Sequence, residues 1–168
     1  MKQAETEPGA IPCPCCGAAG QPVKPGTLRA LLKPESAAQV REEESYFFCG
    51  AFCGAEPCDV VYFAPGSQVF FKADLTVRVG IKESAAPRPL CYCFGHSMES
   101  IMAEIERTGR STAAADIRRR MREEGCACET KNPAGRCCLA AVEQFVREQL
   151  ASSGQEAEVA KPQAGGGC

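Results

Sequence analysis

Neither a secretion signal nor a membrane span is recognisable in the sequence. Its first twelve residues, MKQAETEPGAIP, are polar, and no run of about 18 apolar residues occurs anywhere in the sequence. A disulfide-stapled domain needs the oxidising compartment that export provides. We therefore expect a cytoplasmic protein without membrane insertion, whose thiols stay reduced.

The chain also lacks an excess of basic residues. Its formal net charge is -2 and its pI is near 5.6, whereas nucleic-acid-binding domains normally carry surplus positive charge. The one concentrated basic run, Arg118 to Arg120 with Arg122, is followed by Glu123 and Glu124, which favours a solvated helix face. We expect no nucleic-acid partner.

Residues for familiar catalytic sites are scarce. His96 is the single histidine, and Rieske-type iron ligation normally takes two on one iron, so a polar role near a helix start is the better interpretation. No glycine-rich phosphate loop, Ser/His/Asp set or carboxylate pair in a metal context is recognisable. The pattern favours an electron-transfer or metallochaperone protein over a turnover enzyme.

What the chain has in abundance is cysteine. The thirteen cysteines are grouped as CPCC (13–16), CGAFCGAEPC (49–58), CYC (91–93), CAC (126–128), CC (137–138) and Cys168. Thiolates are soft anionic ligands that favour zinc, copper(I) and iron-sulfur clusters. An odd count also leaves one cysteine over in any scheme of disulfides. The sequence therefore predicts a metal-binding protein.

Composition divides the chain into four segments. We expect a disordered N-terminus (1–12), a β-rich domain (13–85), a helical domain (86–150) and a flexible tail (151–168). The cysteine motifs and resemblances described below predict zinc for the β-rich domain and a 2Fe-2S cluster for the helical domain. The Pro-rich segment SAAPRP, 84–89, marks the boundary between the two middle segments. The fold class that follows is α+β, with a small zinc-stabilised β-rich unit followed by a three-helix unit.

The first unit contains short runs rich in β-branched and aromatic residues, separated by Gly, Pro and Ser. These runs predict strands at 45–48, 59–63, 68–71 and 76–82, and alternation puts Val77, Val79 and Ile81 on one face of the last strand. A four-stranded sheet of this size buries little apolar surface, so small domains of this type often need a metal.

The second unit changes to helical periodicity. Ser97 precedes an apolar-periodic run that ends at Gly109, and Ser111 or Thr112 opens a second run that ends at Gly125. A third helix follows Cys138, with one apolar stripe made of Leu139, Val142, Val146 and Leu150.

The N-terminal cysteines have zinc-site spacing. Cys13-x2-Cys16 followed by Gly17 is typical of half a zinc knuckle, and Cys53-x4-Cys58 supplies the other half. Cys49 competes with Cys53 as the third ligand. Four sulfurs leave no open position, so the site is expected to be structural.

The C-terminal cysteines have a different spacing. The C-x-C at 91–93, a long span and a cysteine leading into a helix resemble the bacterioferritin-associated ferredoxins, whose 2Fe-2S cluster lies among short helices. In those proteins the last two ligands form C-x2-C, whereas here ETKNPAGR separates the last cysteine pairs.

A wider resemblance covers nearly the whole chain between its two ends. CPCCG, CDVVYF, RVGIKE, CYCFGHSMESI and GCACETKNPAGRCCL occur in the same order as in the N-terminal domain of the CopZ copper chaperone family. The resemblance implies one zinc, one 2Fe-2S cluster, and a copper-carrying domain or copper transporter as partner. CopZ continues into a domain with an M-x-C-x-x-C loop, which this sequence does not contain, so direct copper carriage is not expected from it.

Six cysteines compete for four cluster positions. Cys91 and Cys93 are the first two predicted ligands, because backbone amides at a helix entry hydrogen-bond to a cluster held there. Cys128 and Cys138 flank the NPAG turn, and Cys138 leads into a helix, where anionic sulfur is favoured. Cys126 in place of Cys128 and Cys137 in place of Cys138 remain open alternatives.

These predictions lead to one functional hypothesis and one alternative. The first is a zinc- and 2Fe-2S-containing protein that transfers electrons in copper handling, with reduction of Cu(II) to Cu(I) as the candidate reaction. The alternative is a non-redox zinc-binding interaction module in which all the cysteines are structural.

Overall fold

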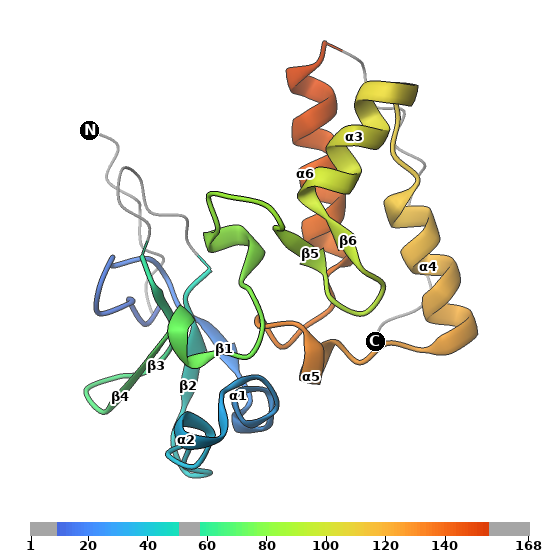
Figure 1. The fold of residues 1–168 in the computed structure, drawn as a ribbon. Helices are drawn as coiled ribbons and strands as arrows, with labels where there is room; N and C mark the ends of the chain where they lie inside the picture. Colours follow the sequence, from blue (N-terminus) through green and yellow to red (C-terminus); the bar gives the residue numbers. More distant parts are fainter. Residues whose placement is uncertain (1–9, 51–57, 155–168) are drawn as a thin grey trace.

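The computed structural model describes residues 10–50 and 58–154. A four-stranded antiparallel sheet, in the order β1-β2-β3-β4, forms its N-terminal part. The strands are β1 (Gln21–Val23), β2 (Tyr46–Phe48), β3 (Val60–Ala64) and β4 (Gln68–Phe71). The helices α1 (Pro25–Leu31) and α2 (Pro34–Ala37) lie between β1 and β2 in the chain and pack beside the sheet (Figure 1).

Strand β3 is the centre of this part, and all five of its residues are buried. Val61, Tyr62 and Ala64 belong to the core that the sheet shares with α1, whereas Val60 and Phe63 belong to a second core that contains three cysteines. A register shift between Val60 and Tyr62 accompanies this division. One strand therefore connects the main core to the cysteine-rich core.

The C-terminal part is helical. It contains a short hairpin of β5 (Pro89–Cys91) and β6 (His96–Ser97), followed by α3 (Met98–Thr108), α4 (Ala113–Glu124), α5 (Cys128–Lys131) and α6 (Leu139–Ser152). Helices α3, α4 and α6 enclose one core around Ile101, Ile105 and Val142, and α5 lies between them and the sheet (Figure 1). Within the described ranges, no helix is long and apolar enough to span a bilayer.

The three long helices confirm the prediction from periodicity, and their ends show why. Ser97 and Ser100 form a reciprocal capping box at the start of α3, with N–H to Oγ distances of 3.1 and 3.0 Å. Gly109 ends the helix with φ of +73°, a conformation that glycine adopts without a Cβ penalty. The coarse expectation of a small sheet followed by helices therefore holds.

The predicted strand at 76–82 is wrong. Thr76 pairs instead with the carbonyl of Leu31, and the segment then turns into a short 3-10 helix, η2 (Gly80–Lys82). The Tyr92 hydroxyl donates to the Arg78 carbonyl at 2.8 Å and accepts from the Gly80 N–H at 3.1 Å. These partners occupy backbone groups that a strand neighbour would need. Val79 is therefore buried because it packs against the core, and not because its segment pairs with a neighbouring strand.

The two parts contact each other along α5 and the loop that follows it. The Tyr62 hydroxyl donates to the buried carbonyl of Pro133 at 2.7 Å, and Lys24 pairs with Glu129 at 2.6 Å. Ala134 packs on the sheet core, while Ile81 packs on both cores. The sheet therefore supports the loop that leads to Cys137 and Cys138.

Candidate metal centres

Four cysteines from three distant segments meet at one end of the sheet. Cys13 and Cys16 lie in a tight turn, Cys49 directly follows β2, and Cys58 lies two residues before β3. Their four Sγ atoms all lie within 4.8 Å of one another. Among the described residues this is the only set of three or more metal-ligand side chains that is so close.

The turn that holds the first pair follows from its sequence. The Cys13 N–H donates to the Ala18 carbonyl at 2.8 Å, and the Gly17 N–H donates to the Cys13 carbonyl at 2.9 Å. Gly17 has φ of +73°, which a residue with a side chain rarely adopts. This turn brings Cys13 and Cys16 to the same side and leaves Cys15 exposed.

The spacing of the four sulfurs fits a tetrahedral zinc ion. Zn–S bonds of about 2.3 Å in a tetrahedron place the sulfurs about 3.8 Å apart. The Sγ atoms of Cys13 and Cys58 are 3.8 Å apart, and those of Cys16 and Cys49 are 3.6 Å apart. Cys13, Cys49 and Cys58 are each less than 5% exposed, which suits a closed structural site.

The burial of these thiols also favours a bound cation. Without a metal, burial raises the pKa of the Cys58 thiol far above its usual range, and the nearby Cys49 sulfur raises it further. A divalent cation reverses this effect because it attracts the thiolates that otherwise repel one another.

The structure places three of the four predicted zinc ligands, Cys13, Cys16 and Cys58, in this group together with Cys49. Cys53, the other predicted ligand, lies outside the described residues. The sequence alone presented Cys49 and Cys53 as competitors. Cys49 directly follows β2, and its N–H donates to the Val61 carbonyl at 2.9 Å.

A second set of cysteines gathers where the β5–β6 hairpin meets α5 and α6. Cys91 ends β5, Cys93 follows in the hairpin turn, Cys128 begins α5, and Cys138 is the N-cap of α6. The sulfurs of Cys93 and Cys128 are 3.5 Å apart, and the Cys138 thiol is near enough to Cys91 to lower its pKa. The four predicted cluster cysteines thus form two pairs.

One detail differs from the expectation for this set. The sequence predicted Cys91 and Cys93 at a helix entry, whereas Cys91 is a strand residue paired with His96. A strand of three residues leaves too little alternation to be recognised in the sequence.

Backbone N–H groups point at these sulfurs. The hydrogen bond from the Cys138 thiol lowers the pKa of Cys91 to about 6, and the amides of Phe94 and Cys93 act in the same direction against the opposing effect of burial. The Ala127 N–H donates to the Cys93 sulfur at 3.4 Å. Burial raises the pKa of the Cys128 thiol, and the Cys138 backbone amide acts against this rise. Such donors stabilise negative charge on sulfur.

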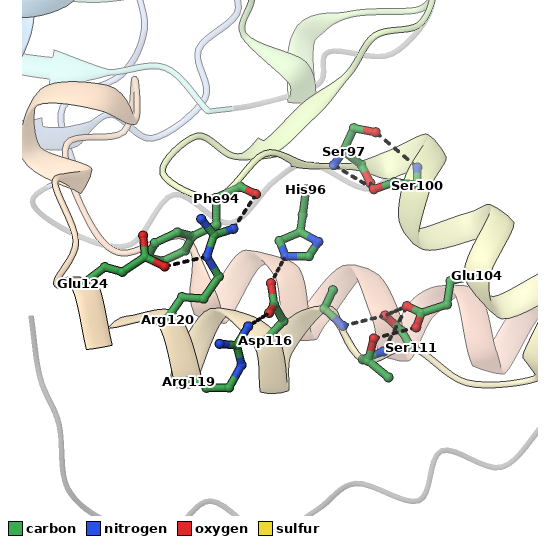
Figure 2. A network of polar contacts seen from close by, with 12 residues as sticks. Phe94, His96, Ser97, Ser100, Glu104, Ser111, Asp116, Arg119, Arg120 and Glu124 are labelled. Carbon is green, nitrogen blue, oxygen red and sulfur yellow. Dashed lines mark hydrogen bonds and ion pairs between the residues drawn. The ribbon is translucent and has the colours of Figure 1, made fainter. Parts of the chain in front are cut away.

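Helix α4 holds the hairpin in place. His96 contacts the Asp116 carboxylate at 2.9 Å, and Asp116 also accepts a hydrogen bond from Arg119 (Figure 2). Arg119 and His96 keep the pKa of Asp116 below its usual range. Arg120 lies over the Phe94 ring, 4.5 Å from its centroid. These contacts give His96 a structural polar role, and they show that Arg119 and Arg120 of the basic run pair with neighbouring groups.

The remaining cysteines of this region lie beside the two pairs. Cys126 and Cys137 are half-buried. A cleft of about 610 Å³ opens next to Cys138, and its lining includes Tyr92, Met98, Cys137 and Phe145. The cleft gives solutes access to this side of the cysteine group.

Comparison with known proteins identifies relatives of both parts. The zf_CopZ family model, described as a zinc binding domain, matches residues 11–76. The copper chaperone CopZ of Archaeoglobus fulgidus is 34% identical over 126 residues, which are 75% of this chain and 57% of the relative. The chain thus spans 57% of that protein's length. The X-ray structure of the A. fulgidus CopZ N-terminal domain superposes with a TM-score of 0.67 at 32% identity, covering 80% of this chain and 97% of that one.

Proposed function

Because the chain belongs to the family of the CopZ N-terminal domain, we propose that it is a cytoplasmic zinc- and 2Fe-2S-containing protein that supplies electrons for copper handling. Zinc binding follows from the family and from the four-sulfur geometry at one end of the sheet. The redox role and the cluster are the parts that we add.

We propose Cys13, Cys16, Cys49 and Cys58 as the zinc ligands, with Cys53 as the alternative to Cys49. This set supports a structural role because three of its members are buried in a core with Val60 and Phe63. The ion would hold together the ends of β2 and β3 and the N-terminal turn. Zinc binding by such small sites contributes directly to folding free energy.

We propose Cys91, Cys93, Cys128 and Cys138 as the cluster ligands. The observation that carries this proposal is the arrangement of their sulfurs in two pairs, because a cluster with two irons and four thiolates takes two sulfurs per iron. The N–H donors toward Cys91, Cys93 and Cys128 would lower the cost of the negative charge that such a group carries. When bound, the cluster supplies reversible one-electron transfer, which matches the single electron that converts Cu(II) to Cu(I).

Copper is the substrate in this proposal. The half-exposed Cys93 and the cleft beside Cys138 leave the cysteine group accessible from solvent, as electron transfer to an external ion or partner requires. A copper-carrying domain or copper transporter is the partner that we propose, since the relative is named as a copper chaperone. Thiolate-rich carriers of that kind hold copper as Cu(I).

The first test measures the metal content of the protein. Protein purified without oxygen should contain about one zinc and two irons per chain and absorb visible light that dithionite bleaches. Cys93→Ser should remove the visible absorption and keep the zinc, and Cys126→Ser, which changes a neighbouring half-buried cysteine, should keep both. Zinc alone, after an attempt at cluster reconstitution, would instead support the non-redox module.

The copper step needs its own measurement because free thiols also reduce Cu(II). Stopped-flow absorption should show reoxidation of the reduced protein on mixing with Cu(II) and a thiol-rich acceptor. If copper were reduced while the visible spectrum stayed that of the reduced protein, the electron would come from thiols and the redox proposal would be wrong.

A further inference from the structure

Lys82 is a buried lysine. It is only 1% exposed, and it is the last residue of η2. An ammonium group is strongly hydrated, and lysine is almost never fully buried unless its charge is paired. The surroundings of Lys82 must therefore supply a partner for a positive charge.

Two of the partners of Lys82 lie in the four-cysteine group. The Lys82 Nζ donates to the Cys49 Sγ at 3.6 Å and to the Cys58 carbonyl oxygen at 3.0 Å. Cys49 is itself fully buried. The ammonium thus reaches the group from a segment 33 residues beyond Cys49 in the chain, and it contacts one sulfur and the backbone of a second cysteine.

The backbone around Lys82 fixes this approach. A Cβ on Gly80 would come within 1.9 Å of the Pro89 carbonyl oxygen, so only glycine allows β5 to pass so close. The Lys82 N–H then donates to the Val79 carbonyl at 2.8 Å, which closes the short helix. The side chain therefore starts from a constrained position that faces the site.

The neighbouring Lys72 shows that this pairing is particular to Lys82. The Lys72 ammonium lies 3.5 Å from the Asp59 carboxylate and 3.7 Å from that of Glu83. It is partly exposed and pairs with carboxylate oxygens, whereas Lys82 is buried and reaches a cysteine sulfur and a cysteine carbonyl oxygen. The two lysines therefore have different partners.

The negative charge of the zinc site explains why the contact between Lys82 and Cys49 is favourable. Four thiolates around Zn²⁺ carry a net charge of about -2, which is unfavourable where three of the ligands are buried. One ammonium reduces that charge by one unit. A charged hydrogen bond to a thiolate also withdraws electron density from it, and sulfur becomes less nucleophilic as its basicity falls.

We propose that Lys82 is a positioning residue of the zinc site, which donates a charged hydrogen bond to the Cys49 thiolate and protects the bound sulfur from electrophiles. The inference rests on the proposed zinc ligation by Cys49. It explains how a thiolate site can stay inert in a protein that meets thiol-seeking metal ions.

The test compares Lys82→Met, which removes charge and donor, with Lys82→Gln, which keeps a donor, and with Lys72→Met as the matched control. Zinc-loaded proteins are treated with excess iodoacetamide, and zinc release is followed with a chromogenic chelator. We expect release about tenfold faster for Lys82→Met, an intermediate rate for Lys82→Gln, and the unmodified rate for Lys72→Met. Mass spectrometry should find Cys49 alkylated earlier in Lys82→Met than in the parent protein.

A second measurement uses the unmodified protein and so does not depend on folding of the variants. In zinc-loaded, ¹⁵N-lysine-labelled protein, the Lys82 ammonium should exchange its protons at least about tenfold more slowly than that of Lys72. Equal exchange of the two lysines, or equal zinc release from Lys82→Met and Lys72→Met, would overturn the role of Lys82. An unmodified protein that binds no zinc would overturn the ligation itself, which is a separate failure.

Discussion

Gly135 is the position where the contact between the two parts can be tested with one methyl group. It lies in the turn between α5 and α6 with φ of +65°, and its N–H donates to the Asn132 carbonyl at 2.8 Å. A Cβ built there would lie 2.9 Å from Val23 Cγ2 and 3.0 Å from Thr27 Oγ1. Gly135→Ala should therefore push this turn away from β1 and α1.

The magnitude follows from two costs. A left-handed conformation costs a residue with a side chain about 1–2 kcal/mol, and forcing a methyl group into a packed contact costs about 1–3 kcal/mol. Their sum, about 2–5 kcal/mol, is a large share of the stability of a small protein. Because Cys137 and Cys138 follow this turn, we also expect a weaker visible spectrum from the variant.

Gly66→Ala is the control. Gly66 lies in the turn between β3 and β4 with φ of +70°, but no atom lies within 4 Å of its Cβ position. It should show the conformational cost alone, about 1–2 kcal/mol. Urea unfolding of both variants, at matched metal content, gives the difference through the midpoint at constant m. If the two variants lost equal stability and kept equal spectra, the turn would not be packed against the sheet as we describe.

Two further predictions concern single contacts. Tyr62→Phe leaves the buried Pro133 carbonyl without its 2.7 Å partner, and should cost about 1–3 kcal/mol in urea unfolding; a loss below about 0.5 kcal/mol would contradict it. Arg88 lowers the pKa of Glu99 from 4.5 to about 2, so their pairing stabilises the fold at neutral pH and is lost as pH falls through that lower value. The stability difference between the parent protein and Glu99→Gln should thus shrink from pH 5 towards pH 2, and a difference that did not change with pH would count against the pairing.

The helices were the most predictable elements because local residues define their ends. Ser97 and Gly109 act within one turn of α3, so the sequence contains the whole signal for that helix. The 76–82 segment was not predictable in the same way. Val77, Val79 and Ile81 do pack on one core, but the partners of the backbone groups of this segment, Tyr92 and Leu31, are distant in the chain.

The candidate sites were also predictable only where local residues define them. Local spacing indicated Cys13 with Cys16 and Cys91 with Cys93, because each pair spans one turn. Which cysteines join them depends on how β2, α5 and α6 are placed, and no local pattern contains that information. Lys82 was missed for a related reason: a lysine in an apolar run is usually an exposed residue, and only the fold shows where its ammonium lies.

Strand β3 connects the two proposed metal sites, and this has a consequence for zinc. The strand begins two residues after Cys58, and its Tyr62 supports the turn that precedes Cys138. Zinc at the four-cysteine group would fix the start of β3, and with it the position from which Tyr62 holds that turn. The N-terminal site would then act as part of the scaffold for the second cysteine group, even though the Pro-rich segment at 84–89 separates them in the sequence.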